Sequence, residues 1–235
     1  MSSDKKDRGF ISALLKLIYP PCCASCGKLL QTDEDELCLL CAKTLLLRES
    51  PRCQCGGELE GVFAAFAYSG TGAELMKKFK FCRSTDAYEA ALRRPFEACI
   101  ESACCGLGID IVVPVPLYIS DKHKRGFNQS EYIAQRLAKH LCLPCDADIL
   151  QKTQKNETQH FLPREKRLEN VKDVYACKNP KIAAEKTILL VDDITTTGAT
   201  IAECARVLHK AGAKTVYAAV VLETPNNYTK KHVET

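Results

Sequence analysis

The residues best suited to chemistry stand between positions 188 and 200, where an apolar run is followed by two acids and a hydroxyl-rich turn. The run 188–191 shows no alternation, which predicts a strand buried on both faces of a parallel sheet. Asp192 and Asp193 follow, and the turn 195–198 leads into an amphipathic helix. The N–H groups at the start of that helix can bind a phosphate. The acids can accept hydrogen bonds from sugar hydroxyls or approach a bound Mg²⁺.

This segment resembles the phosphoribosyl-pyrophosphate (PRPP) motif of type I phosphoribosyltransferases, because it reads Asp-Asp-x-x-Thr-Thr-Gly-Ala-Thr after an apolar strand. The resemblance implies that the two acids hold the 2′- and 3′-hydroxyls of a ribose and that the threonine turn holds its 5′-phosphate. The PRPP-binding residues that it implies here are Asp192, Asp193, Thr195, Thr196, Thr197, Gly198, Ala199 and Thr200. The alternative is an ordinary strand, turn and helix with a polar turn.

A second set of reactive side chains lies near the N-terminus, where two C-x₂-C pairs are separated by eleven residues. The pairs are Cys23 with Cys26 and Cys38 with Cys41. Four thiolates at this spacing can bind one Zn²⁺ tetrahedrally, and so short a segment has little core of its own. We therefore expect a structural zinc that supplies folding free energy and leaves no open position for catalysis.

Three further cysteines bear on that prediction. Cys22 adjoins Cys23 and could be confused with it as a ligand, whereas Cys53-Gln-Cys55 has the wrong spacing for a further knuckle, so no second zinc is expected. No convincing export signal precedes the fifteen cysteines, and no window approaches the ~20 apolar residues of a membrane span. Disulfides are therefore not expected, and the sequence indicates a reducing cytoplasm.

Length and composition set the domain organisation. Hydrophobic residues make up 46% of the chain and charged residues 26%, as in a soluble globular protein. The net charge of +4 permits anionic ligands and does not by itself indicate nucleic acid. We expect an N-terminal tail and short helix over 1–21, a zinc-binding module over 22–57, a phosphoribosyltransferase-like domain over 58–225 and a tail over 226–235.

The elements that would position the acids are buried strands alternating with helices. Strand-like apolar runs cover 61–68, 109–115, 188–192 and 215–222. Asn128 and Glu131 resemble an N-cap and its reciprocal acid before one helix. The helix after the threonine turn has an apolar stripe at Ile201, Cys204, Ala205 and Leu208. This order predicts an α/β fold with a mostly parallel sheet and flanking helices, in which ligands bind at the carboxyl ends of the strands.

Two helices are expected between the first and second strands. Thr71 and Glu74 form a capping-box pattern at the start of the first helix. Its basic residues form either a solvated face or a guide for an anionic substrate; they are Lys77, Lys78, Lys80 and Arg83. The second helix, over 86–103, contains Pro95, which predicts a break or kink.

The second strand should end in a basic loop. Pro114 and Pro116 donate no N–H to a sheet, so a loop is expected over 118–127. Its basic residues are Lys122, His123, Lys124 and Arg125. The planar guanidinium of Arg125 suits a bidentate contact with phosphate, whereas His123 is an acid–base candidate without an identifiable partner.

The order of these parts is similar to that of the ComF family, in which a Cys₄ zinc module precedes a phosphoribosyltransferase domain. The resemblance covers about residues 20–223. The segments that carry it are Val113-Pro-Val-Pro-Leu117, Lys124-Arg-Gly-Phe-Asn-Gln129, Gln159 with Arg167-x-x-Asn170, and Leu190 to Thr200.

The resemblance implies roles for particular residues. The catalytic residues that it implies are Asp192, Asp193 and Arg125. Pyrophosphate with its Mg²⁺ would face Pro116, Leu117 and Arg125. A flexible loop would close over the reaction with Gln159, Arg164 and Arg167.

Three functions remain open. The first is PRPP-dependent transfer of ribose 5-phosphate to an acceptor that the sequence does not identify. The second is the sensing of PRPP or a nucleotide without turnover. The third, implied by the family's association with natural competence, is binding of single-stranded DNA with other competence proteins as partners. Phe79, Phe81 and Phe127 stand beside basic residues and are the candidates for stacking on bases.

Overall fold

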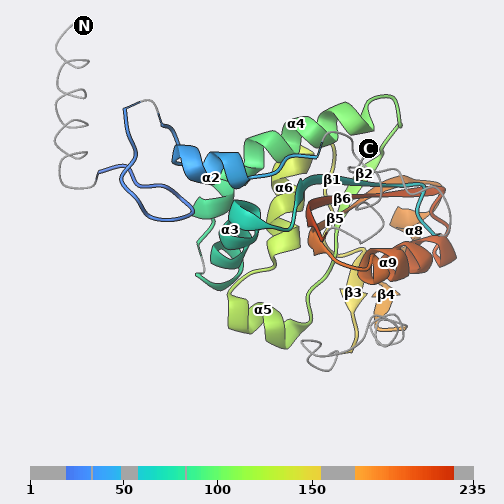
Figure 1. Ribbon diagram of the computed structural model, residues 1–235. Helices are drawn as coiled ribbons and strands as arrows, with labels where there is room; N and C mark the ends of the chain where they lie inside the picture. Colours follow the sequence, from blue (N-terminus) through green and yellow to red (C-terminus); the bar gives the residue numbers. More distant parts are fainter. Residues whose placement is uncertain (1–19, 33, 49–57, 83, 155–172, 225–235) are drawn as a thin grey trace, which may run out of the picture.

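The computed structural model describes residues 20–32, 34–48, 58–82, 84–154 and 173–224 (Figure 1). The predicted N-terminal helix and C-terminal tail lie outside these ranges. Within them, no helix is both long enough and apolar enough to cross a bilayer.

A parallel sheet forms the centre of the fold (Figure 1). In the described ranges its strands are β1 (Gly61–Ala67), β6 (Thr215–Glu223), β5 (Thr187–Thr195) and β2 (Ile111–Pro114), in that spatial order. Every neighbouring pair of these strands is parallel. β5 therefore lies between β6 and β2, and its carboxyl end adjoins the carboxyl ends of both. The predicted parallel α/β sheet is confirmed.

Helices cover both faces of the sheet because successive side chains of β5 point to opposite sides. On one side, Leu190 belongs to a core with α9 (Ala199–Lys210). On the other side, Leu189 belongs to a core with α3 (Gly70–Phe81), α4 (Arg93–Cys104) and α6 (Gln129–His140). The predicted apolar stripe of α9 is buried at all four positions, Ile201, Cys204, Ala205 and Leu208.

The predicted irregularity in the second helix is present. A π-helical segment, η1 (Tyr88–Leu92), leads directly into α4. Pro95 lies in the first turn of α4 and lacks the N–H that would bond the carbonyl of Ala91. The wider π turn therefore falls where the regular α-helical bond is missing.

Two of the expected local structures are wrong. The first concerns α3, whose N-cap is Ser69 and not Thr71. The Thr71 hydroxyl instead lies 2.8 Å from the hydroxyl of Thr44. Glu74 pairs with Lys77 at 2.7 Å, so no capping box forms. The Thr71 hydroxyl therefore contacts a distant segment of the chain and not the start of its own helix.

The second concerns residues 118–127, which were expected to form a loop. Most of them form helix α5 (Ile119–Arg125), which ends at Gly126 with φ +88°. Glycine adopts this left-handed conformation without the strain that a side chain adds, so it stops the helix. Asn128 then caps α6 as predicted, by accepting a hydrogen bond from Ser130 N. Its expected reciprocal acid, Glu131, pairs instead with Lys122 at 2.9 Å.

Three short elements were not expected. An antiparallel pair, β3 (Leu150–Lys152) with β4 (Tyr175–Cys177), stands beside the main sheet, and helix α8 (Pro180–Ala183) follows it. Each is three or four residues long. So short a run shows no periodicity, which explains why the sequence did not predict it.

The N-terminal module contains helix α2 (Leu39–Thr44) and then extends along the edge of the sheet. Arg48 N donates to Ala65 O at 2.9 Å, and Ala67 N donates to Leu46 O at 3.1 Å. The residues after α2 therefore pair with β1 in the antiparallel sense, with Leu47 beside Phe66. The module is joined to the sheet by backbone hydrogen bonds as well as by the covalent chain.

Candidate functional site

Asp192 and Asp193 lie near the carboxyl end of β5, and both are buried. The strand runs on to Thr195, three residues beyond its expected end, because Asp192 and Ile194 still pair with β6. The Ser130 hydroxyl donates to Asp192 Oδ1 at 2.7 Å, and Asp193 N donates to the same oxygen at 2.9 Å. The Lys80 ammonium lies 2.9 Å from Asp193 Oδ2. The acids are thus held from α6 and α3.

Each carboxylate of the pair keeps one oxygen available. Asp192 Oδ1 and Asp193 Oδ2 are the oxygens with the partners just described. Among the described residues, no hydrogen bond or ion pair reaches Asp192 Oδ2 or Asp193 Oδ1. A carboxylate oxygen is a hydrogen-bond acceptor, so the pair offers two acceptors on adjacent residues. Two neighbouring hydroxyls of a sugar are a chemically matched pair of donors.

The environment of Asp192 favours its protonated form. Burial raises the pKa of Asp192 to about 7, and the neighbouring charge of Asp193 contributes in the same direction. The hydrogen bond from Ser130 and the charge of Lys80 oppose this rise. The negative charge of Asp193 makes ionisation of Asp192 less favourable. The site therefore changes its charge close to neutral pH.

The turn after β5 has the conformation that an anion site requires. Gly198 has φ +78° and caps α9, and Ala202 N donates to Gly198 O at 2.9 Å. A side chain at this position would meet no atom within 4 Å, so its backbone angle, and not space, is what favours glycine. The N–H groups of the first helical turn have no partner within the helix and point out of its N-terminus. Thr197 Oγ1 accepts one of them, from Ala199, at 3.4 Å.

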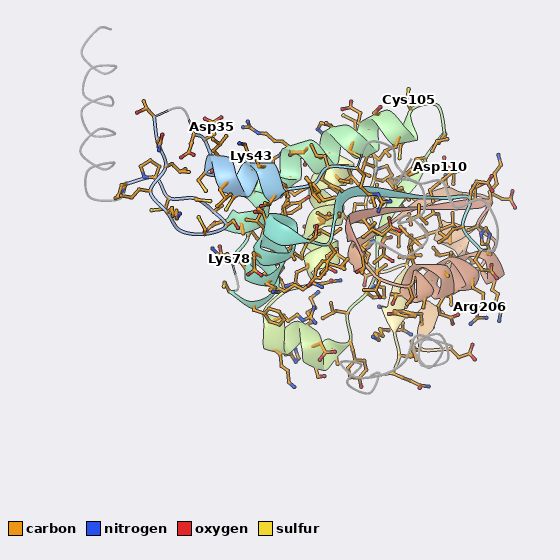
Figure 2. The ribbon with its side chains drawn as sticks, viewed as in Figure 1. Asp35, Lys43, Lys78, Cys105, Asp110 and Arg206 are labelled. Carbon is orange, nitrogen blue, oxygen red and sulfur yellow. The ribbon has the colours of Figure 1, made fainter. Side chains whose placement is uncertain are left out.

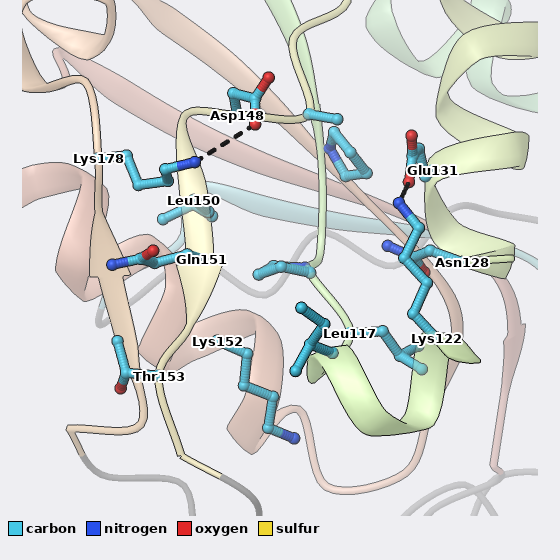
Figure 3. A pocket seen from close by; sticks show the side chains of 14 residues that line it. Leu117, Lys122, Asn128, Glu131, Asp148, Leu150, Gln151, Lys152, Thr153 and Lys178 are labelled. Atoms are coloured by element: carbon cyan, nitrogen blue, oxygen red, sulfur yellow. Dashed lines mark hydrogen bonds and ion pairs between the residues drawn. The ribbon is translucent and has the colours of Figure 1, made fainter. Parts of the chain in front are cut away.

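The loop after β2 is fixed beside the acids. Val115 N donates to Val191 O at 2.9 Å, and Asn128 Nδ2 donates to Val115 O at 3.1 Å. Pro116 and Leu117 follow and line a cavity of about 570 Å³ between this loop, α5, α6 and β3 (Figure 3). The predicted site residues after β2 and β5 therefore come to the same end of the sheet.

Three lysines line that cavity. Lys122 pairs with Glu131 on α6, and Lys178 lies 3.5 Å from Asp148 on the opposite rim (Figure 3). Lys152 of β3 lies near Leu117, with its ammonium 5.5 Å from the centre of the Tyr175 ring (Figure 3). Burial lowers the pKa of Lys152, and the positive charge of Arg125 acts in the same direction. Lys122 and Lys178 are thus each paired with an acid, whereas Lys152 and Arg125 affect each other as positive charges.

Several predicted residues are not among the described residues that line this cavity. His123 is exposed on α5, and Arg125 lies half-buried in its last turn. The predicted flexible-loop residues Gln159, Arg164 and Arg167 lie outside the described residues. Phe79 is fully buried against Tyr88, so its expected role in stacking on bases is wrong.

The expected basic face of α3 is largely occupied by internal contacts. Lys77 pairs with Glu74, Lys78 donates to the carbonyl of Ala24 at 2.8 Å, and Lys80 pairs with Asp193. Arg83 lies outside the described residues. Within the described part of α3, Lys78 therefore contacts the module, Lys80 contacts the acid pair, and Lys77 pairs within its own helix.

The four predicted zinc ligands converge. The sulfur atoms of Cys23, Cys26, Cys38 and Cys41 all lie within 4.8 Å of one another. Cys26 Sγ and Cys38 Sγ are 3.7 Å apart, close to the roughly 3.8 Å edge of a tetrahedron with Zn–S bonds near 2.3 Å. The donor set fits a structural zinc. Cys22 Sγ points elsewhere and donates to Pro20 O at 3.3 Å, and Cys53 and Cys55 lie outside the described residues.

Sequence reasoning missed three contributors to the site. Ser130 directly follows the segment 124–129 that resembles the ComF family, and this position was the signal that could have pointed to it. Lys80 was considered only as part of a charged helix face. Lys152 comes from one of the short strands that no pattern predicted. Each reaches the site through a contact between distant parts of the chain.

Two family models match the chain. A model described as "Phosphoribosyl transferase domain" matches residues 128–234, and one described as "Double zinc ribbon domain" matches residues 14–74. These matches cover the acid pair with its threonine turn and the four-cysteine cluster, respectively. The fold and its sites thus define a phosphoribosyltransferase domain preceded by a zinc ribbon.

Known relatives match most of the chain. "DNA utilization protein YhgH" of Shigella flexneri is 30% identical over 202 residues, which cover 83% of this chain and 86% of the relative. "Competence protein ComFC" of Streptococcus pneumoniae is 29% identical over 194 residues, which cover 83% and 84%. The chain belongs to the ComF family. Among solved structures, adenine phosphoribosyltransferase from Saccharomyces cerevisiae is 18% identical over 64% of this chain and 75% of its own, with a TM-score of 0.40.

Proposed function

We propose that this protein binds PRPP together with Mg²⁺ at the carboxyl ends of β5 and β2. The observation that carries the proposal is the pair of available oxygens, Asp192 Oδ2 and Asp193 Oδ1, beside the Gly198 turn. The 2′- and 3′-hydroxyls of a ribose would donate to these two oxygens. The 5′-phosphate would accept hydrogen bonds from the first turn of α9, where the helix dipole favours an anion.

The pyrophosphate would lie on the β2 side of the ribose. The Pro116–Leu117 loop, Arg125 and Lys152 stand there, and the nearby positive charges match a polyanionic group. Mg²⁺ keeps most of its waters and needs few protein carboxylates. An ion that arrives with the pyrophosphate therefore needs no separate cluster of protein carboxylates. When bound, Mg²⁺ neutralises charge on the leaving group.

The reaction that this arrangement suits is transfer of ribose 5-phosphate. The bond between C1′ and the pyrophosphate oxygen breaks, the bonding electrons leave with pyrophosphate, and a nucleophile on the acceptor forms the new bond to C1′. Positive charge develops on the sugar as this happens, and the buried carboxylates are placed to stabilise it. The proton of the acceptor leaves with solvent or pyrophosphate. The alternative is that the protein binds PRPP without transferring its ribose 5-phosphate. A measurement of turnover distinguishes the two functions.

Calorimetric titration with PRPP in the presence of Mg²⁺ tests the binding. Asp192→Asn and Asp193→Asn should each weaken binding by about tenfold or more, because each removes a charged acceptor. Asp86→Asn removes one negative charge from an exposed position and serves as the control. Affinity that is equal in all four proteins would refute the site.

Transfer is tested separately. The protein would be incubated with PRPP, Mg²⁺ and a cell extract, and products would be searched by mass spectrometry for an added ribose 5-phosphate. A product that is absent with the Asp192→Asn/Asp193→Asn double variant would establish an enzyme and identify the acceptor. Tight PRPP binding without any such product would favour a sensor.

A second candidate function is binding of single-stranded DNA. The printed names of the relatives, DNA utilization protein and competence protein, refer to DNA and to competence. In this chain the supporting observation is Phe81, whose side chain is 71% exposed at the end of α3. Exposed aromatic rings stack on bases, and such contacts are worth about 1–3 kcal/mol each.

This candidate calls for its own measurement. Fluorescence anisotropy with a labelled oligonucleotide should show weaker binding as salt increases, since phosphate contacts release counterions. Phe81→Ala should weaken binding, whereas Ile182→Ala, which truncates an exposed apolar residue on α8, should not. Affinity that is independent of both salt and Phe81 would exclude this mode of binding.

A further inference from the structure

We propose that the zinc module is a structural part of the ribose site, because it holds helix α3 in the position where Lys80 meets Asp193. Lys80 is then a positioning residue for the acid pair, and the module acts on ligand binding without touching the ligand. The inference rests on the proposed binding of PRPP. Its structural half, the coupling of Lys80 to Asp193, is measurable without PRPP.

The first step is the contact between Lys80 and Asp193. The side chains are 18% and 8% exposed, so the 2.9 Å ion pair is shielded from solvent. Lys80 takes only the Oδ2 atom of Asp193 and leaves Oδ1 available. Removing the lysine would leave the buried Asp193 without the cation that pairs with it, a state that costs free energy. Lys80 therefore fixes the direction of Asp193 and allows both acids to stay in place.

The second step is the attachment of α3 to the module. Lys78, two residues before Lys80, donates to Ala24 O at 2.8 Å. Ala24 lies in the first zinc knuckle, between Cys23 and Cys26, and Lys78 lies on the side of α3 nearest the module (Figure 2). Successive lysines of one helix thus face opposite ways, one into the module and one into the site.

The start of α3 is attached as well. The hydroxyls of Thr71 and Thr44 are 2.8 Å apart. Gly70 has φ +48°, and a Cβ atom there would stand only 2.8 Å from Thr44 O. No side chain fits this approach without displacing the backbone of the module. The two segments are therefore in close contact at both the first and the third turn of the helix.

A third attachment reaches the carboxyl end of the sheet directly. Arg48, just after α2, forms an ion pair with Glu223 at the end of β6. Glu223 stands beside Thr195, the last residue of β5, in the strand register. The module therefore contacts the strand next to the acid pair in addition to the helix that carries Lys80.

Zinc is what gives the module a defined shape. Its buried core consists of Cys23, Cys38 and Cys41, with Leu30 and Leu37 packed against it. Three of these five side chains are metal ligands, so without the metal little apolar core remains. Loss of zinc would release Ala24 and Thr44 from fixed positions. The attachments of α3 would be lost with them.

The test uses lysine variants of α3 in the zinc-loaded protein. Lys80→Met should weaken binding of PRPP with Mg²⁺ by about tenfold or more, and Lys80→Arg should restore much of it. Lys78→Met should weaken binding by several-fold even though its contact is in the module. Lys77→Met is the matched control, because Lys77 is exposed on the same helix and pairs only with Glu74 among the described residues. It should bind like the unaltered protein.

Zinc content and unfolding midpoint are measured for each variant, so that a misfolded protein is recognised. Thr71→Val breaks the other attachment with little change of volume and should give the same direction of effect as Lys78→Met. If folded Lys78→Met and Thr71→Val both bind PRPP normally, the inference is overturned, whereas the ribose site stands.

A second measurement needs no ligand. Lys80→Met should lower the denaturant midpoint more in the chain with Asp193 than in an Asp193→Asn background, since only the former leaves an uncompensated acid. Equal losses in the two backgrounds would contradict the coupling. If instead the unaltered protein fails to bind PRPP while this coupling is present, the proposed function falls and the positioning role of Lys80 remains.

Discussion

The Ser130 hydroxyl donates a 2.7 Å hydrogen bond to Asp192 Oδ1, which joins the start of α6 to the end of β5. The same helix start is capped by Asn128, whose amide also holds the carbonyl of Val115 after β2. The ends of two neighbouring strands are therefore fixed by two residues at one helix N-terminus. The position of α6 decides the geometry of the proposed ribose site and of the loop beside it.

Ser130→Ala should weaken PRPP binding. The hydrogen bond to a charged acid is worth about 1.5–3 kcal/mol, so a loss of roughly tenfold is expected. The remaining Asp192 carboxylate would also hold its proton more tightly, because the hydroxyl favours the charged form. Ser102→Ala, at an exposed position of α4, is the control. Calorimetry with all three proteins decides the matter, and equal affinities would mean that Ser130 does not position Asp192.

Asp192→Asn should make the protein more stable at mildly alkaline pH. The folded pKa of about 7 lies above the ordinary value of 3.8, so between these values the folded state binds more protons than the unfolded one. Stability of the unaltered protein therefore falls as pH rises through this window. The variant lacks the titrating group. At about pH 8 its free energy of unfolding should therefore exceed that of the unaltered protein by about 4 kcal/mol more than it does near pH 4. Urea denaturation at both pH values measures the two differences, and a constant difference would contradict the raised pKa.

Purified protein should contain about one zinc per chain, because one set of four thiols converges. Cys38→Ser should release the metal and lower the unfolding midpoint. Cys82→Ser changes an exposed free thiol at the end of α3 and should keep both. Metal analysis of the three proteins gives the result. Two zinc ions per chain would show that a second site exists outside this cluster.

Gly198→Ala should separate the backbone requirement of the anion turn from ordinary stability. Gly198 and Gly106 both have φ +78°, and a Cβ atom at either would meet nothing within 4 Å. Alanine at each position should therefore cost a similar amount, about 1 kcal/mol. Only Gly198→Ala should also weaken PRPP binding, because Gly106 follows α4, away from the acid pair. If the two alanine variants lost the same affinity for PRPP, the turn at Gly198 would not hold the phosphate.

The local parts of the site could be predicted from the sequence because neighbouring residues determine them. An unbroken apolar run indicated β5, the glycine at 198 indicated a turn before α9, and two C-x₂-C pairs indicated the zinc cluster. Where the pattern was local but its partner was distant, prediction failed. Thr71 was expected to cap its own helix and instead meets Thr44 of the module.

Only the tertiary structure decided which charges meet the acid pair. Sequence spacing does not show that Lys80 turns inward while Lys78 turns to the module, since both are lysines on one short helix. Nor does it show that Ser130, 62 residues before Asp192, supplies a hydrogen bond to it. Backbone propensities act over a few residues, whereas a buried acid must find its partners among all segments packed against it. The sequence by itself determined which residues could do chemistry, and packing decided which of them stand together.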